Sequence, residues 1–144
     1  MQAQGDCVME YAEFSQKLRQ LEKDIDRAAR NTVNKTVLTG MRETMEVTPT
    51  HEGKYPDGRL GGTLQKGWEA TPAHKVGDEW RGDYHNNVYY GPYVNWGHRV
   101  VHNGITVGWS PAHLFLEEGI VKAVKEQKKI WKTEFRKVKE RGGW

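Results

Sequence analysis

The chain has 144 residues, a length that predicts a single domain with one core. Its apolar content of 36%, charged content of 28% and formal net charge of +3 are typical of a globular protein and do not by themselves indicate a nucleic-acid binder. A lone cysteine, Cys7, excludes an internal disulfide and a multi-cysteine zinc site and fits a reducing cytoplasm, and the absence of a long apolar run predicts no membrane partner.

A long amphipathic helix is predicted from Tyr11 to Met45, after a flexible stretch over residues 1–10. Apolar residues recur every three or four positions, which places them on one helical face. The helix should end at Thr48-Pro49, because a residue before proline leaves the helical conformation. The stripe comprises Phe14, Leu18, Leu21, Ile25 and Ala28, and continues at Val33, Val37 and Met41.

The middle of the chain is predicted to be a loop followed by short strands. Residues 49–63 carry two prolines and four glycines and read as a loop. Strands are expected over 64–71 and 76–84, with residues 87–90 on or beside a third strand. Gly91-Pro92 interrupts any strand, so Tyr90 to Gly97 should form a bend or a single helical turn.

Asn103-Gly104 is the sharpest local signal in the sequence. It stands between Val100-Val101-His102 and Ile105-Thr106-Val107, and both residues of the pair tolerate positive φ. This pattern predicts an exposed β-hairpin turn.

A second long helix is predicted from Ser110-Pro111 to about Arg141. Ser110 suits the N-cap and Pro111 the first helical position, and Gly142-Gly143 should stop the helix, leaving 142–144 as a tail. Its apolar face holds Leu116, Ile120, Val124, Trp131, Phe135 and Val138. The element order predicts an α+β fold over residues 11–141, in which two long helices pack on a small antiparallel β-sheet of three to five strands that includes a β-hairpin.

Three segments occur in a characteristic order: PDGRLGGTLQKGW (56–68), NNVYYGPYVNWGHR (86–99) and SPAHLFLEEGI (110–120). In this order and spacing the chain resembles the tail-component family of long-tailed bacteriophages, small neck and tail-completion proteins of the head–tail joint, over roughly residues 10–140. The chain departs from the family pattern at three places: Gly58 follows Asp57 directly, Asn95 replaces a usual glutamate, and His113-Leu114 replaces Gln-Pro.

The resemblance implies a structural virion protein without catalysis or cofactor. It would be assembled in the host cytoplasm into a homo-oligomeric ring of six subunits, with twelve as the alternative. The ring would lie in the virion neck between the portal and the tail, touch adjacent neck and tail proteins, and let phage DNA pass.

The aromatic turn near Tyr90 leaves three readings open: core aromatics, a subunit interface, or a small-molecule pocket. Tyr and Trp are enriched at interfaces, and six tryptophans are many for this length. The glycines of the 56–62 segment lack a phosphate-loop ending, and Arg59 suits a carboxylate on a neighbouring protein. The residues expected at a subunit or neighbour interface are Arg59, Leu60, Trp68, Tyr90, Tyr93, Trp96 and His98.

The histidines do not form a metal motif. None of the six forms an i, i+4 pair within a predicted helix, and a zinc site needs three or four converging ligands. Asp83, His85 and Asn86 only faintly suggest a metal nuclease, so no enzyme activity is expected.

The last helix is strongly basic. Between residues 122 and 141 it carries nine cations and three carboxylates, an excess of six. A solvated helix face explains this composition, as does contact with DNA phosphates or an acidic partner. Non-specific DNA binding through this helix is therefore the alternative function, and its expected contacts are Lys125, Lys128, Lys129, Lys132 and Arg136.

Overall fold

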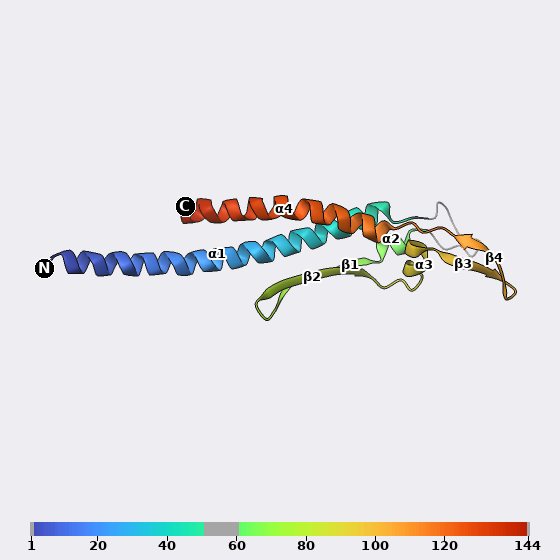
Figure 1. Cartoon of the computed structure of the whole chain (residues 1–144), viewed down its shortest axis with the longest axis horizontal. Helices are drawn as coiled ribbons and strands as arrows, with labels where there is room; N and C mark the ends of the chain where they lie inside the picture. Colours follow the sequence, from blue (N-terminus) through green and yellow to red (C-terminus); the bar gives the residue numbers. More distant parts are fainter. Residues whose placement is uncertain (1, 51–60, 144) are drawn as a thin grey trace.

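The computed structural model describes residues 2–50 and 61–143, with side chains from residue 10 onward. It is an elongated α+β molecule, as predicted (Figure 1). In chain order the elements are α1 (Gln2–Val47), α2 (Thr63–Lys66), β1 (Trp68–Val76), β2 (Glu79–Asn86), α3 (Gly91–Trp96), β3 (His98–His102), β4 (Ile105–Ser110) and α4 (Phe115–Gly142).

The two long helices lie side by side and antiparallel, and α1 extends well beyond the C-terminal end of α4 (Figure 1). α1 also takes in residues 2–10, which the apolar pattern does not reach. The β1–β2 hairpin packs along α1, and the β3–β4 hairpin projects at the opposite end of the molecule from the N-terminus. This extended arrangement leaves much of each helix outside any core.

Small residues form the seam between α1 and α4. Buried positions of α1 are spaced by four or eight residues, at Asp24, Ala28, Thr32, Gly40 and Thr44, and those of α4 include Gly119 and Ala123. A Cβ added at Gly119 would lie 1.7 Å from Thr44 Oγ1 and 2.9 Å from its Cα. The two backbones therefore approach so closely that only glycine fits at this crossing.

The apolar core is small and lies where α1, α2, β1 and α4 meet. It consists of Leu64, Trp68 and Phe115, with the rings of Trp68 and Phe115 in edge contact at 6.1 Å. The Trp68 indole also donates to Thr48 Oγ1 at 3.0 Å, so its polar atom is satisfied inside the protein.

The predicted sheet of three to five strands is wrong, because the strands form two separate two-stranded sheets. Residues 64–66 belong to α2 rather than to a strand, since a helical turn lets Leu64 enter the core while Gln65 donates to the Met45 carbonyl. The turn at Gly77-Asp78 separates β1 from β2, so the second strand begins at Glu79.

No strand forms at residues 87–90, contrary to expectation. The Asn86 side chain donates to the Leu64 carbonyl at 2.6 Å and accepts from Val88 N–H at 2.9 Å. These two side-chain hydrogen bonds turn the chain away from the sheet, where a third strand would need backbone partners. The helical turn expected between Tyr90 and Gly97 is present as α3.

The Asn103-Gly104 turn is confirmed. Both residues have positive φ, 49° and 78°, and β3 pairs with β4 in antiparallel register from His98↔Ser110 to His102↔Ile105. A Cβ at Gly104 would meet nothing within 4 Å, so its glycine is needed for backbone conformation and not for space.

α4 begins at Phe115 rather than at Ser110-Pro111. Its N-cap position is Leu114, which has φ 51° and no side chain able to cap. Residues 111–114 instead run past α3, where the Asn95 carbonyl accepts from His113 N–H and Leu114 N–H at 3.0 and 2.9 Å. The start of this helix is set by a residue about twenty positions earlier.

Candidate interface surfaces

The aromatic turn at α3 is a rigid corner. α3 contains Pro92 in its first turn, and Gly97 ends it with φ 78°. A Cβ on Gly97 would lie 2.6 Å from the Ser110 carbonyl oxygen, so this glycine permits the close approach of two backbone segments. The corner therefore fixes the position of the β3–β4 hairpin that follows.

Asn95 joins this corner to α4. It is only 3% exposed, and its Oδ1 accepts from Leu116 N–H at 3.0 Å. This bond satisfies a free amide in the first turn of α4, the task that Leu114 cannot perform as N-cap. From the sequence, Asn95 was noted only as a departure from the family pattern, and its capping of α4 from 21 positions away was not predicted.

Glu117 completes the joint. Asn95 Nδ2 donates to Glu117 Oε2 at 2.8 Å, and Trp96 Nε1 donates to Oε1 at 2.6 Å. Partial desolvation would raise the pKa of Glu117, but these hydrogen bonds outweigh it and hold the pKa below its usual value. The carboxylate thus stays charged and holds the exposed Trp96 ring through its indole N–H.

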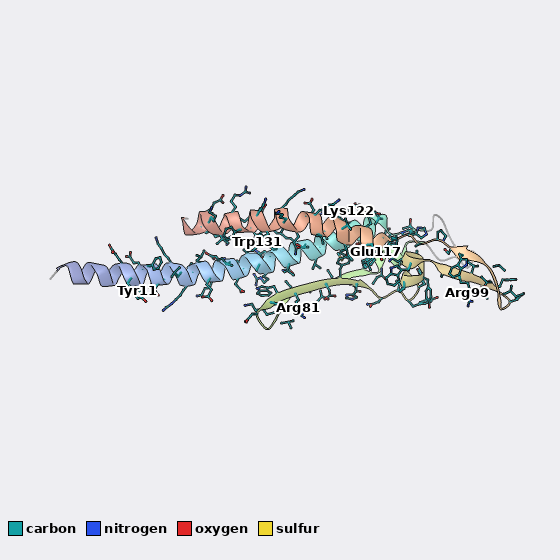
Figure 2. The ribbon with its side chains drawn as sticks, viewed as in Figure 1. Tyr11, Arg81, Arg99, Glu117, Lys122 and Trp131 are labelled. Atoms are coloured by element: carbon teal, nitrogen blue, oxygen red, sulfur yellow. The ribbon has the colours of Figure 1, made fainter. Side chains whose placement is uncertain are left out.

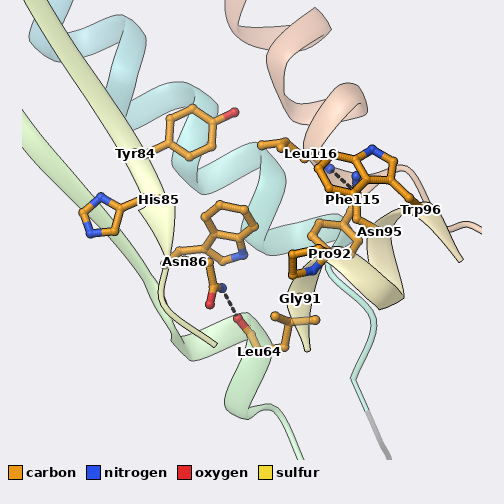
Figure 3. A pocket seen from close by; sticks show the side chains of 11 residues that line it. Leu64, Tyr84, His85, Asn86, Gly91, Pro92, Asn95, Trp96, Phe115 and Leu116 are labelled. Atoms are coloured by element: carbon orange, nitrogen blue, oxygen red, sulfur yellow. Dashed lines mark hydrogen bonds between the residues drawn. The ribbon is translucent and has the colours of Figure 1, made fainter. Parts of the chain in front are cut away.

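A pocket of about 270 Å³ opens beside this joint (Figure 3). Its lining is largely apolar and comes from α2, the β1–β2 hairpin, α3 and the start of α4. Pro92 and Trp96 are its exposed members, while Leu64 and Phe115 lie at its base in the core. The pocket has the size and chemistry to receive one apolar side chain of a neighbouring protein.

The structure separates the predicted interface residues into three groups. Trp68 is a core residue at 9% exposure, which corrects its assignment to an interface, and Tyr90 is half-buried against the same core. Tyr93 and Trp96 are exposed at 57% and 59%, and the Tyr93 ring packs edge-on against the half-buried His98 at 6.1 Å. Arg59 and Leu60 lie outside the described residues.

The β3–β4 hairpin exposes apolar side chains that the sequence did not single out as a surface. The β-branched residues on both sides of Asn103-Gly104 are the sequence signal for this surface, although they were used only to predict the hairpin turn. Five such side chains are between 39% and 75% exposed: Val100, Val101, Ile105, Val107 and Trp109.

Both helices also expose large apolar side chains. On α1 these begin with Tyr11 at 75% and Phe14 at 54%. The predicted apolar face of α4 is buried only in part: among its members Val138 is buried and Leu116 half-buried, whereas Ile120, Val124, Trp131 and Phe135 are 37–61% exposed. The other buried residues of α4 are Phe115, Gly119, Ala123 and Glu134. The small seam residues permit a close crossing, and the bulkier side chains are left beside it.

The basic face of α4 divides into paired and free cations. Lys129 contacts Glu126 at 2.9 Å and Arg136 contacts Glu140 at 3.9 Å. Within residues 10–50 and 61–143, Lys125, Lys128 and Lys132 have no carboxylate within ion-pair distance. The free cations are exposed and are the ones available to an external anion.

No cluster of three or more His, Cys, Asp or Glu side chains that could hold a metal ion occurs in the part of the chain that is described. His85 contacts Asp83 at 3.4 Å and Glu69 at 3.7 Å on an exposed strand face, which places the faint nuclease-like group at the surface. Of the described helices, none is long and apolar enough to cross a membrane.

Comparison of the chain with protein-family models, with curated proteins and with solved structures finds no match. The exposed surfaces and the motif resemblance are therefore the grounds for any functional proposal.

Proposed function

We propose that this chain is a structural subunit of the phage head–tail neck. It assembles into a ring, of six copies or alternatively twelve, that joins the portal and head-completion proteins to the tail and lets DNA pass. The observation that carries this proposal is the exposure of large apolar side chains on α1, α4 and the β3–β4 hairpin at once. Among its described residues the chain buries six apolar side chains and exposes many more, which is suited to burying the exposed ones against other subunits.

The geometry of the motifs supports the same proposal. Two of the three motif segments, 86–99 and 110–120, meet physically through Asn95 and Glu117, so they act as one joint. That joint orients the projecting hairpin and leaves Tyr93 and Trp96 exposed beside an apolar pocket. Such a fixed aromatic corner is suited to a contact with a neighbouring neck or tail protein.

The free cations on α4 favour a second candidate function. Lys125, Lys128 and Lys132 could neutralise phosphates without reading bases, as a non-specific DNA-binding protein requires. In a ring this surface serves the passage of DNA, whereas in a stand-alone binder it is the whole function. The oligomeric state separates the two.

The test is the mass and shape of the purified protein. We expect mass photometry to show a closed oligomer, electron microscopy to show rings, and antibodies to label the neck of purified virions. A monomer at every concentration, absent from virions, would contradict the ring. A monomer or dimer that shifts DNA would establish the alternative.

A further inference from the structure

The N-terminal part of α1 carries an apolar stripe that none of the described residues covers. We define the overhang as residues 2–20 of α1, the part that extends beyond α4 (Figure 1). All of its described side chains, from Glu10 to Gln20, are exposed except the half-buried Ser15. Apolar side chains exposed in a row along a helix are suited to burial against a partner surface.

The stripe follows the spacing of a coiled-coil seam. Tyr11, Phe14, Leu18, Leu21 and Ile25 are separated by three, four, three and four residues. The next positions in this spacing are Ala28 and Thr32, which are 3% and 6% exposed because α4 covers them. The overhang therefore continues a face that already binds one helix, and a second helix would extend that seam.

A matching surface lies on the flank of α4. A groove of about 380 Å³ runs between Ala29, Thr32 and Val33 of α1 and Val124, Gln127, Lys128 and Trp131 of α4. The Trp131 ring packs beside Phe135 with centroids 5.7 Å apart, and both rings are more than a third exposed. Figure 2 shows Tyr11 on the free part of α1 and Trp131 on α4, far apart along the same molecule.

Charge distinguishes the two surfaces. Glu10 and Glu22 lie four residues from Phe14 and Leu18, beside the overhang stripe, and neither has a cationic partner among the described residues. Lys128 lines the groove and likewise has no carboxylate partner within the described ranges. Glu10 in the overhang and Glu22 just beyond it are therefore carboxylates that can pair with Lys128 of the groove, although the overhang also carries the cations Lys17 and Arg19.

We infer that the overhang of one subunit docks into the α1–α4 groove of a second copy of this chain, and that this is the contact that closes the proposed ring. The inference rests on the proposed function. Because the overhang and the groove are different surfaces, the contact is head-to-tail; repeating it generates a ring where the rotation between subunits closes and an open filament where it does not, but never a symmetric dimer. The apolar stripe supplies the buried area, and the flanking charges set the direction.

Two exposed positions test the contact without disturbing the fold. Leu18→Glu places a charge in the overhang stripe, and Val124→Glu places one in the groove. Their matched controls are Gln16→Glu on the opposite face of the overhang and Val121→Glu on α4, which is 52% exposed and does not line the groove. Circular dichroism should show the helix content of the wild type in all four variants.

We expect Leu18→Glu and Val124→Glu each to be monomeric at concentrations where the wild type and both controls are assembled. An equimolar mixture of the two monomeric variants should form a one-to-one heterodimer, because one intact overhang can still enter one intact groove. Mass photometry measures each species directly.

Other outcomes overturn the inference in distinguishable ways. If Val124→Glu stays assembled while Leu18→Glu does not, overhangs pair with one another. If both variants assemble as rings, the contact lies elsewhere and the ring proposal stands. A wild-type chain that remains monomeric removes the ring and this contact together.

Discussion

Glu134 is a buried carboxylate that links the two long helices through three neighbours. It accepts from Lys35 and Asn31 on α1 and from Lys137 on α4, and its side chain is only 4% exposed. The bond from Lys35 is the largest influence and, with those from Lys137 and Asn31, overcomes the cost of burial and lowers the pKa of Glu134 to about 2. The two helices are therefore held by a charged group at a point where the seam has little apolar contact.

The first prediction concerns the pH dependence of this link. A carboxylate whose folded pKa is depressed adds stability above its ordinary pKa of 4.5 and loses it as the pH falls toward about 2. Glu134→Gln should reduce the free energy of unfolding at neutral pH by about 3 kcal/mol, and the difference from the wild type should shrink as the pH falls through that window.

Urea unfolding at a fixed protein concentration and a series of pH values measures this difference. The control is Glu140→Gln, because Glu140 is 69% exposed and contacts only Arg136, at 3.9 Å. If the difference in free energy of unfolding between wild type and Glu134→Gln is the same at every pH, the partners of Glu134 do not lower its pKa.

At the scale of elements, the crossing of α1 and α4 depends on Gly119. A methyl group at this position would overlap Thr44, which is fully buried and whose hydroxyl donates to the Tyr84 hydroxyl at 3.1 Å. Alanine normally stabilises a helix relative to glycine by about 1 kcal/mol, so propensity alone predicts a gain.

The second prediction is that Gly119→Ala is destabilising despite this propensity. The helices must move apart, and we expect a loss of about 3 kcal/mol in the free energy of unfolding. Gly108→Ala is the control, because a Cβ there meets nothing within 4 Å. Thermal melts of both variants decide the matter, and an unchanged or raised melting temperature for Gly119→Ala would contradict the close crossing.

Elements specified by neighbouring residues could be predicted from the sequence. The α1 stripe, the Gly91-Pro92 turn and the Asn103-Gly104 hairpin each depend on residues within one or two turns of each other. The start of α4 and the split of the sheet could not, because Asn95 and Asn86 act on backbone groups 21 and 22 positions away. Side-chain amides that replace backbone partners leave no periodic signal.

The sequence pattern also could not predict which residues of α4 contact α1. Apolar spacing identifies a stripe but not the partner that covers it. Here the seam uses Gly119 and Ala123, which let the backbones approach, and the bulkier residues such as Val124 and Trp131 remain exposed. The aromatic excess predicted an interface, but Trp68 belongs to the core, whereas Tyr93 and Trp96 are exposed.

At the scale of the whole molecule, the surfaces of α4 point in different directions. Its seam faces α1, its apolar flank lines the groove, and its exposed cations occupy the remaining side. If the groove is filled by a neighbouring subunit, the cationic side stays free. That side would then face either the DNA channel or an acidic neighbouring ring.

The last prediction distinguishes these two directions. If the cations face the channel, the assembled protein should bind duplex DNA weakly and without sequence preference. If about four phosphates in all are neutralised, the affinity should fall about 100-fold between about 50 and 200 mM salt. Replacing Lys125, Lys132 and Lys139 by Gln removes three exposed cations that lie outside the groove and have no carboxylate partner among the described residues. This variant should flatten the salt dependence and leave the ring intact.

Replacing Arg19, Lys23 and Arg30 by Gln removes the same charge from the exposed back of α1 and should change DNA binding little. If instead DNA binding is equal in both variants, and reversal of Lys125, Lys132 and Lys139 to Glu abolishes particle assembly while the ring still forms, the basic face binds an acidic neighbour and not the DNA.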